Sequence, residues 1–494
     1  MPIINPPTDI SIVAVLPAIL IALTALAVLM LTPILPRDRQ HTTGWVALGG
    51  ILLTLAVCVG LWAGQSAQYA FSRGVVLDGF GLFFDSASLV GSAIAVLLSL
   101  NYLTLEDIDH GEYYSLLLFS IAGMMLLGSA HDLVVFFLAL EGLSLALYVL
   151  AGFNRTSLRS EEAGMKYFLL GAFSFGFLLY GIALVYGATG VTAYTDIADA
   201  LQRNGDLVTA PLMRVGIGLI LVGFGFKLAF VPFHQWTPDV YDGAPTPVTA
   251  FMSVGTKVAV FGALLRMMSV AFPAMRADWS LILWGMAILT MLLGNVVALT
   301  QTSVKRLLAY SSIAQAGYVL IGVIARASDV SSAVPSVMFY LMSYTVMNLG
   351  AFAVVIALAE RGEPHTNIED YAGLGRRQPL LAGAMAVFMF SLAGIPPTAG
   401  FIGKFYLFYA AVEANYPELA IVGVIATAIS VFYYLRIIVV MYLRQPDTSV
   451  AQTRLVVPGA LSFSLMLTAV VTIGLGLFPV VLVWLTQAAQ AAGQ

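Results

Sequence analysis

Charged residues are scarce in this sequence of 494 residues, where Asp, Glu, Lys and Arg make up 10%, against roughly 25% in a soluble globular chain. Hydrophobic residues make up 60% and the mean hydropathy is +0.94, which excludes a water-soluble domain. Apolar stretches of about 20 residues recur along the chain, and this length crosses a bilayer core about 30 Å thick. We therefore expect an all-α polytopic membrane protein with about 14 transmembrane helices.

Cysteine is almost absent, since Cys58 is the only one. One thiol forms no internal disulfide, and without clusters of Cys or His we expect no iron–sulfur, haem or zinc site. There is no G-x-G-x-x-G or Walker A motif, so we expect no nucleotide chemistry in this chain. The formal charge of −4 gives no basic patch, which argues against nucleic acid as a partner.

Lysine and arginine are divided unevenly between the loops on the two sides of the predicted spans. One side carries Arg37, Arg39, Arg155, Arg159, Lys305, Arg306, Arg361, Arg376, Arg377, Arg444 and Arg454, and the other carries Arg73, Arg203, Arg214, Arg276 and Arg326. Because basic loops stay in the cytoplasm, we expect both termini on the non-cytoplasmic side.

The unusual content of the sequence is inside the predicted helices. Lys227, Lys257 and Lys404 lie near the middle of predicted spans, and Glu141, in LVVFFLALEGLSLALYVLAGF, is the one deeply placed carboxylate expected. An ionisable group at membrane depth costs several kcal/mol, so it is a functional candidate, although each could also be a structural ion pair or packing residue. A lysine–carboxylate pair that opens and closes can release and take up a proton, which arginine cannot do.

The remaining basic residues near the predicted helix ends have an ordinary explanation. Lys166 and Lys305 are expected to extend their ammonium groups towards water, and Arg266 and Arg436 are expected to be interfacial anchors.

Two of the lysine-bearing helices are interrupted. Pro232 and His234 follow Lys227 in GFGFKLAFVPFHQW, and Pro396 and Pro397 precede Lys404 in SLAGIPPTAGFIGKF. Broken helices at membrane depth persist beside protein or water, so two breaks in two halves point to an ion path. Simple proline kinks are the alternative.

The spacing of the breaks suggests an internal repeat. We expect three N-terminal helices (1–112), a first five-helix block (113–270), a second five-helix block (279–443) and a C-terminal helix (444–494). An odd number of helices in each block would make the second copy inverted. The best local match between the blocks is GFGFK against GFIGKF.

Three stretches carry a resemblance to a known family: FKLAFVPFHQWTPDVYDGAPTPVTAFMSVGTK from Phe226, EAGMKYFLLGAFSFGFLLYGIALVYGATG from Glu162 and SVKRLLAYSSIAQAGYVLIG from Ser303. From Asp78 to about Leu443 the chain resembles the subunit N family of bacterial proton-pumping NADH:quinone oxidoreductase, respiratory complex I, counterpart of mitochondrial NADH dehydrogenase subunit 2. The related subunits L and M and the Mrp-type antiporters share the broken helices but usually differ after the histidine.

The resemblance implies roles for individual residues. Glu141 and Lys227 match a charge pair, Lys257 matches a central lysine, and Lys404 matches the lysine of the second broken helix. His234 matches a histidine beside the first break and is a further candidate. The family would also imply a bacterial inner membrane and neighbouring subunits K and M. Other subunits of the complex would bind NADH, FMN, iron–sulfur clusters and quinone.

The resulting hypothesis is a proton relay along the middle of the membrane. Lys227, held by Glu141, would pass its proton through Lys257 and water to Lys404, which would release it on the non-cytoplasmic side. An Mrp-type cation/proton antiporter subunit and a non-transporting scaffold subunit stay as alternatives. A lipid-modifying enzyme is a more distant one, because His131 and Asp132 have no partnered serine motif.

Overall fold

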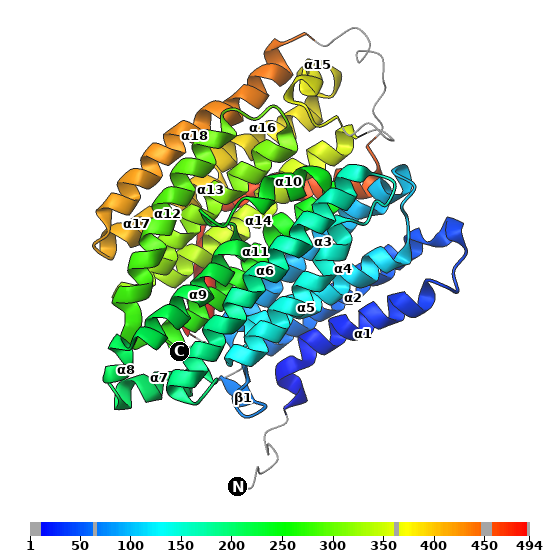
Figure 1. The fold of residues 1–494 in the computed structure, drawn as a ribbon. Coiled ribbons are helices and arrows are strands. Elements are labelled where there is room, and N and C mark those ends of the chain that lie inside the picture. The colour runs from blue at the N-terminus through cyan, green and yellow to red at the C-terminus, as the bar shows by residue number, and fades with distance from the viewer. Residues whose placement is uncertain (1–10, 63–66, 360–364, 446–456, 492–494) are drawn as a thin grey trace.

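The computed structural model describes residues 11–62, 67–359, 365–445 and 457–491. They form one bundle of long helices that run roughly parallel or antiparallel to one another (Figure 1). In this part of the chain, 13 helices are long and apolar enough to cross a membrane, which agrees with the polytopic helical fold. Arg361 and Arg454, which entered the charge count above, lie outside the described residues.

The first half of the bundle ends at the first helix break. In chain order its elements are η1 (Ile12–Val15), α1 (Leu16–Leu31), η2 (Arg37–Arg39), α2 (His41–Trp62), β1 (Gln68–Ala70), β2 (Val75–Leu77), α3 (Gly79–Leu105), α4 (Gly111–Ser129), α5 (Leu133–Ala151), α6 (Leu158–Thr189), α7 (Tyr194–Arg203), α8 (Asp206–Thr209) and α9 (Pro211–Leu228). Strands β1 and β2 form an antiparallel hairpin in which Tyr69 lies opposite Val76.

The second half begins after that break. Its elements are α10 (Trp236–Gly243), α11 (Thr246–Val270), η3 (Pro273–Met275), α12 (Arg276–Ala298), α13 (Val304–Ala325), η4 (Arg326–Ser328), α14 (Ala333–Leu358), η5 (Ile368–Tyr371), α15 (Leu374–Arg377), α16 (Pro379–Ala393), α17 (Ala399–Glu413), α18 (Pro417–Leu443), α19 (Gly459–Leu477) and α20 (Val480–Ala491).

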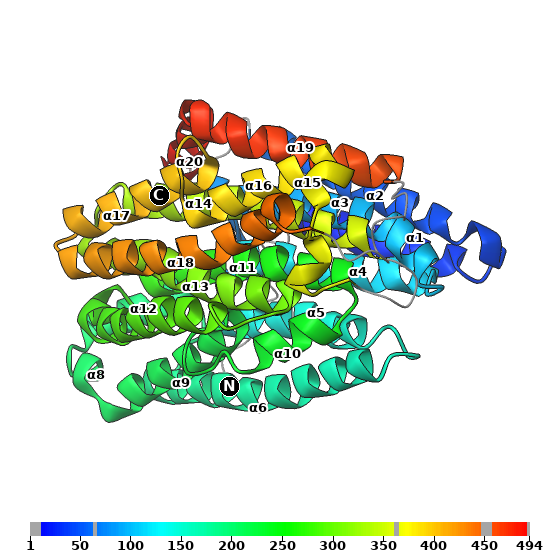
Figure 2. The same ribbon diagram turned by 90° about the horizontal axis from the view of Figure 1, so that it is seen from above.

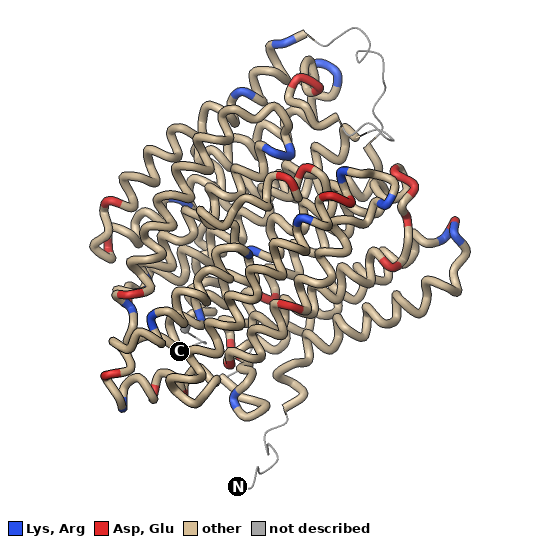
Figure 3. The backbone as a smooth tube through the Cα atoms, in the orientation of Figure 1, with Lys and Arg blue, Asp and Glu red and all other residues tan. Residues whose placement is uncertain are grey.

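The bundle has two ends, each tied by short backbone bridges. At the β1–β2 end, which comprises residues 68–77, 130–132 and 190–210, Val75 bridges Ala130 and Asp132 bridges Ala193. At the α15 end, which comprises residues 106–110, 299–303 and 365–378, Ser303 bridges Asn367. Figure 3 shows most charged residues gathered at the two ends and few between them. This is the distribution expected of helices that cross a bilayer.

Helices α3, α11, α13 and α14 form the interior of the bundle. Every residue of α11 from Thr246 to Met268 is buried, and α11 packs against both α3 and α14. Helices α6 and α19 lie on opposite flanks (Figure 2), and their outer faces carry exposed apolar residues such as Phe173 and Met466. A charged side chain in the middle of α11 or α13 is therefore surrounded by protein.

Both predicted helix breaks are present, and their backbones close in the same way. Helix α9 ends before Ala229 at φ 60°, and α16 ends before Gly394 at φ 79°. The N–H of Phe230 donates to the carbonyl of Gly225 at 2.7 Å, and the N–H of Ile395 donates to the carbonyl of Phe390 at 3.0 Å. These hydrogen bonds satisfy carbonyl groups that an interrupted helix would leave without partners.

The second break lies in the remaining predicted span, which consists of two short helices instead of one long helix. Helices α16 and α17 have 15 residues each, about 22 Å at 1.5 Å per residue, so neither crosses a 30 Å core alone. Lys404 follows its break, whereas Lys227 precedes its own. The motifs GFGFK and GFIGKF therefore lie on opposite sides of their breaks.

Candidate functional site

Lys227 lies at the last turn of α9, directly before the first break, and its side chain is 2% exposed. Its Nζ atom donates a hydrogen bond of 2.8 Å to the hydroxyl of Tyr167 on α6. The same atom lies 5.0 Å from the ring centroid of Tyr167, 5.7 Å from that of Tyr148 and 6.0 Å from that of Phe175. Aromatic faces stabilise an ammonium group, so this cage holds the lysine in place of a counter-charge.

Glu141 lies on α5 with a partly exposed side chain. The rings of Phe136 and Phe224, 5.0 Å apart, bring α5 against α9, and the charges of Glu141 and Lys227 act on each other through space. Among the described residues, however, the two side chains form no direct ion pair, and Tyr167 is the hydrogen-bond partner of the lysine. The charge pair implied by the family is thus present here as a separated pair.

Lys257 lies in the middle of α11 and is 3% exposed. Its Nζ atom donates to the backbone carbonyl of Ser312 on α13 and lies 5.8 Å from the ring centroid of Tyr344 on α14. The hydroxyl of Tyr344 in turn donates to Oγ of Ser312 at 2.8 Å. The lysine therefore contacts only neutral groups, and no carboxylate among the described residues is paired with it directly.

Lys404 lies in the second turn of α17 and is also 3% exposed. Its Nζ atom donates a 3.0 Å hydrogen bond to the carbonyl of Leu392, which lies at the end of α16 on the other side of the break. It also lies 4.6 Å from the ring centroid of Tyr318. The break itself thus provides the acceptor, since an uninterrupted helix would use the Leu392 carbonyl internally.

A row of polar side chains on α13 and α18 lies between the last two lysines. Ser311 and the hydroxyl of Tyr434 are 2.5 Å apart, and Nε2 of Gln315 donates to Tyr434 at 3.2 Å and to the carbonyl of Leu392 at 3.3 Å. Sequence reasoning did not select these residues. The signal was available in AYSSIAQAGY, because repeated hydroxyl and amide side chains are unusual in a helix buried on every side.

The polar chain is interrupted between Lys227 and Lys257. The rings of Tyr167 and Trp236 stack with centroids 4.5 Å apart, and Trp236 meets Tyr241 edge to face at 6.2 Å. Tyr241 interacts with Ser312, next to Lys257. The first lysine is therefore separated from the other two by an aromatic wall whose only polar groups are hydroxyls and an indole N–H.

His234 lies within the first break, and its side chain is partly exposed. Its Nδ1 atom is buried and has no hydrogen-bond partner within the described part of the chain. The structure therefore does not join His234 directly to any of the three lysines.

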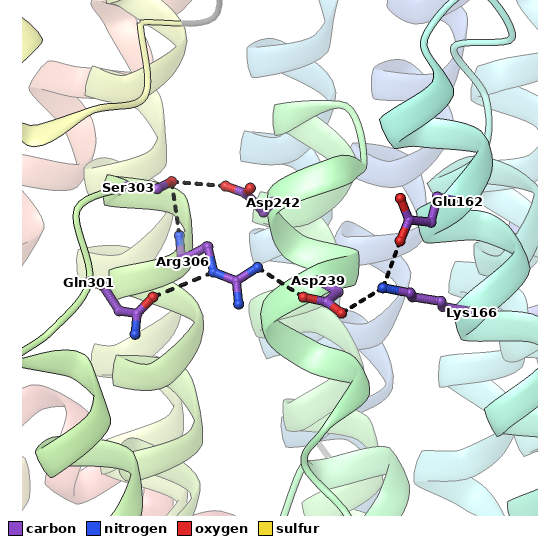
Figure 4. Close-up of polar contacts among 7 residues, drawn as sticks. All are labelled: Glu162, Lys166, Asp239, Asp242, Gln301, Ser303 and Arg306. Carbon is purple, nitrogen blue, oxygen red and sulfur yellow. Dashed lines mark hydrogen bonds and ion pairs between the residues drawn. The ribbon is translucent and has the colours of Figure 1, made fainter.

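A second polar network braces the α15 end of the same helices. Lys166 on α6 contacts Glu162 and Asp239 at 2.7 Å each, and Arg306 on α13 contacts Asp239 at 2.8 Å (Figure 4). Nearby, Ser303 donates to Asp242 at 2.8 Å. These groups are one-third exposed or more, so they link α6, α10 and α13 at the surface, where Lys166 was expected.

Lys305 corrects the expectation of a lysine that extends to water. Its side chain is 4% exposed and donates to the carbonyl of Ala244 at 2.8 Å. It lines a cavity of about 310 Å³ that Glu106, Asp242 and Thr366 also border. Because α10 ends at this carbonyl, the lysine completes the cap of a short helix instead of reaching outwards.

The expectation for Arg266 was wrong as well. This arginine is 6% exposed and donates to both carboxylate oxygens of Asp78, at 2.7 and 2.8 Å, and to the carbonyl of Gly128 at 3.1 Å. Asp78 lies 188 residues from Arg266 in the sequence. The sequence therefore gives no indication that Asp78 is the counter-charge of this arginine. Arg436 instead is partly buried and donates to the carbonyl of Gln301.

Two carboxyl groups besides Glu141, the one expected near mid-span as a partner for a buried lysine, are enclosed by protein. Asp78 and Asp85, at the start of α3, are 2% and 5% exposed, and both are more buried than Glu141. Sequence alone missed Asp85 because the preceding loop put it near the predicted end of its span. The first turns of α3 are instead covered by α4 and α11.

Removing Arg266 should destabilise the protein strongly. In Arg266→Leu the buried Asp78 loses its ion-pair partner, and breaking a buried pair in this way typically costs about 3–5 kcal/mol. Thermal unfolding of the purified protein in mild detergent would measure the loss. The matched control is Arg214→Leu, which removes an exposed ion pair with Asp278 at the same end and should cost about 0–1 kcal/mol. Equal shifts in the two variants would contradict the assignment of a buried, stabilising pair.

The arrangement as a whole consists of three buried ammonium groups, one separated carboxylate and a row of hydroxyl and amide side chains. A hydroxyl group donates and accepts hydrogen bonds at once, so such a row can hand protons between titratable groups. For the residues described, no group of three or more His, Cys, Asp or Glu side chains could hold a metal ion.

Comparison with protein families gives a match over the central part of the chain. Residues 130–430 match the family described as NADH:quinone oxidoreductase/Mrp antiporter, TM. The chain is 50% identical over 453 residues to NADH-quinone oxidoreductase subunit N of Trichlorobacter lovleyi, covering 92% of each chain.

Two solved structures share the fold. A chain of respiratory complex I from Thermus thermophilus with bound aureothin superposes with a TM-score of 0.78 at 35% identity, covering 94% of this chain and 98% of that one. A chain of the Mrp complex from Dietzia sp. superposes with a TM-score of 0.84 at 23% identity, covering 97% of both. The second similarity shows the shared fold alone.

Proposed function

From the premise that this chain belongs to the subunit N family of NADH-quinone oxidoreductase and is a membrane subunit of that enzyme complex, we propose that it moves protons through a relay of Glu141, Lys227, Lys257 and Lys404. Quinone reduction elsewhere in the complex would drive the relay by changing the charge state next to Lys227. Differential stabilisation of two charge states by a remote event is the thermodynamic form of such coupling.

The observation that carries the proposal is the hydrogen-bonded row on α13. Lys257 binds the carbonyl of Ser312, and the neighbouring Ser311 begins a row that continues through Tyr434 and Gln315 to the carbonyl that also binds Lys404. A scaffold subunit would have no need for ammonium groups at both ends of a buried polar row, because each costs several kcal/mol at membrane depth. Tyr167 would hold the proton-carrying Lys227 until the separated Glu141 draws it away.

The two five-helix blocks, 113–270 and 279–443, would be inverted copies of one unit. Two observations support this arrangement. The backbone at both breaks forms the same type of hydrogen bond. Asp132 and Ser303, which directly precede α5 and α13, each form a backbone bridge. Residues 1–112 and 444–494 would be additions outside the repeats. In this arrangement the breaks would be the movable elements.

The α15 end would face the bacterial cytoplasm and the β1–β2 end the opposite side of the inner membrane, with both termini away from the cytoplasm. The arginine-rich loops support this orientation, since basic loops are retained in the cytoplasm. The cavity beside Lys305 would then be where protons are taken up. Lys305 and Ser312 are seven residues apart on α13, so they share a face of that helix.

The partners would be the neighbouring membrane subunits M and K together with lipid. NADH, FMN, iron–sulfur clusters and quinone would be bound by other subunits, while this subunit would contribute proton-carrying side chains and no cofactor of its own. Membership in the subunit N family supports these assignments.

An Mrp-type antiporter subunit is less well supported. The matched family description includes Mrp antiporters, but the identity is 50% to a subunit N and 35% to a chain of complex I, against 23% to a chain of an Mrp complex.

Purification of the tagged chain from its native membrane in mild detergent tests the proposal. We expect a large complex that oxidises NADH with quinone and in which chemical cross-links join this chain to subunits M and K. Recovery of a small assembly with cation/proton exchange and without NADH oxidation would contradict the proposal and favour the antiporter.

A further inference from the structure

Asp85 is a buried carboxyl group that the relay described above does not use. It is 5% exposed, and its Oδ1 atom has no hydrogen-bond partner among the described residues. The carboxyl group occupies the space left on α4 by the missing side chain of Gly128, because a Cβ atom at that glycine would lie 2.3 Å from Oδ1. A buried carboxyl without a partner is most stable in its neutral form, so this position is suited to hold a proton.

Asp85 belongs to a polar stripe that follows α11. Asp78, Asp85, Ser88 and Ser92 are spaced by seven, three and four residues on α3, which puts them on one face. Phe84 lies beside Gly262, and Gly91 lies near Val254, so α3 and α11 are antiparallel.

This register brings the stripe to the central lysine. Ser88 lies at about the level of Lys257, and Asp85 lies about one turn further towards the β1–β2 end. The Oγ atom of Ser88 is buried and also has no hydrogen-bond partner in the described part of the chain. Ser88 therefore offers a free hydroxyl at the level of Lys257, whose Nζ atom itself contacts α13 and α14.

The stripe ends at the ion pair of Asp78 and Arg266, which lies about 14 Å from Lys257 along α11. The charges of Arg266 and Asp78 both act on Asp85, and the carbonyl of Gly128, next to the Asp85 carboxyl, accepts a hydrogen bond from Arg266. Arginine stays charged at any relevant pH, so Arg266 cannot carry the proton itself. Asp85 is the titratable group between the lysine and this pair.

His131 closes the same region at the β1–β2 end. It is buried, and neither ring nitrogen has a hydrogen-bond partner among the described residues. Burial, and then the charge of Arg266, lower the pKa of His131 to about 4. The neutral ring therefore offers an acceptor without adding a positive charge.

A cavity reaches this region from the β1–β2 end. It has a volume of about 90 Å³ and is lined by Phe80, Arg266, Ser269, Arg326 and Gln490. This is room for water molecules, and the polar side chains among the apolar lining residues give them partners. The cavity borders Arg266, which binds the carbonyl of Gly128 next to the Asp85 carboxyl.

We propose that Asp85 is the group through which protons leave this subunit, in place of the exit at Lys404 that the sequence suggested. Neutral Asp85 gives its proton to water in the cavity beside Arg266 and becomes a carboxylate. The ammonium of Lys257 then gives a proton to the carboxylate through Ser88 and water, which leaves a neutral amine and restores the acid. A positive charge on Lys404 drives this step by repelling the charge on Lys257. The inference rests on the proposed relay.

The test compares Asp85→Asn with Lys257→Met in the complete complex reconstituted into liposomes. The readout is the number of protons moved per electron, with Asp206→Asn, an exposed carboxylate at the same end, as the matched control. We expect Asp85→Asn to lower the ratio as far as Lys257→Met does and the control to leave it unchanged. A wild-type ratio in Asp85→Asn together with a lowered ratio in Lys257→Met would overturn the exit and leave the relay standing. Wild-type ratios in both would overturn the relay and the exit together.

Two further measurements cover the case in which Asp85→Asn fails to assemble. Asp85→Ser keeps a small polar group without an acidic proton and should show the same loss. In the wild-type complex, isotope-labelled aspartate should shift a carboxylic-acid C=O band that changes in infrared difference spectra during turnover. The absence of any such aspartate band would overturn the proposal.

Discussion

Proton movement through this subunit should fall by roughly 10²-fold or more when Lys257 is replaced by methionine, the range lost when a positioned acid–base group is removed. Lys257 contacts α13 at Ser312 and lies at the level of Ser88 of the α3 stripe, and the proposed relay and exit both pass through it. Methionine fills a similar volume but carries no proton, so both routes lose their shared member. Proton pumping by reconstituted complexes, measured with a pH-sensitive dye during NADH oxidation, would show the loss.

The same substitution should leave stability unchanged or raise it. The ammonium of Lys257 contacts a carbonyl and an aromatic ring but no counter-charge, and buried charged groups are often replaced by apolar ones without loss. A structural lysine would behave in the opposite way, with lowered stability and retained pumping. Lys166→Met is the matched control, since that lysine lies in the surface network of Figure 4 and its loss should leave pumping intact.

The second large effect is expected at Lys404, where arginine and methionine should both stop pumping. Arginine keeps the positive charge next to Tyr318 and Leu392 but cannot release a proton. Methionine removes the charge permanently. If Lys404 acts by alternating between charged and neutral forms, each variant fixes one of the two states and the cycle stops.

This pair of variants separates a switching role from a fixed electrostatic role. NADH-driven pumping and assembly of the complex would be measured in parallel for both. Normal pumping in Lys404→Arg with lost pumping in Lys404→Met would mean that a constant charge suffices, which contradicts the relay. The carbonyl of Leu392 keeps Gln315 as a donor in both variants, so we expect both complexes to assemble.

The sequence predicted those features that depend on local chemistry. Proline interrupts a helix wherever it occurs in its interior, so the breaks at Pro232 and at Pro396–Pro397 could be located, and both are present. Burial of Lys227, Lys257 and Lys404 followed from their distance to the predicted helix ends, and all three side chains are at most 3% exposed.

The sequence could not predict the partners of these groups. Lys227 is bound to Tyr167, 60 residues earlier, and Arg266 is bound to Asp78, 188 residues earlier. Such pairs depend on which helices pack together, and hydropathy carries no information on that choice. Lys305 was misjudged for a related reason, because its acceptor is created by the end of the short helix α10.

The separation of Glu141 from Lys227 is the feature that only a structure could provide. A family resemblance identifies both residues, yet the lysine is held by an aromatic cage while the carboxylate lies on the neighbouring helix. A separated pair has room for two states, one with the proton near Tyr167 and one with the lysine drawn towards Glu141. Under the proposed relay, these two states beside the first break would form part of the bistable element that coupling to a remote reaction requires.

The measurement that tests the relay most directly is the number of protons pumped per electron in complexes carrying Glu141→Gln or Lys227→Ala. Each variant removes one charge of the separated pair, and quinone reductase activity in the presence of an uncoupler would verify that electron transfer is intact. The relay predicts a lower proton-to-electron ratio in both variants than in the wild-type complex. An unchanged ratio at normal turnover would contradict it.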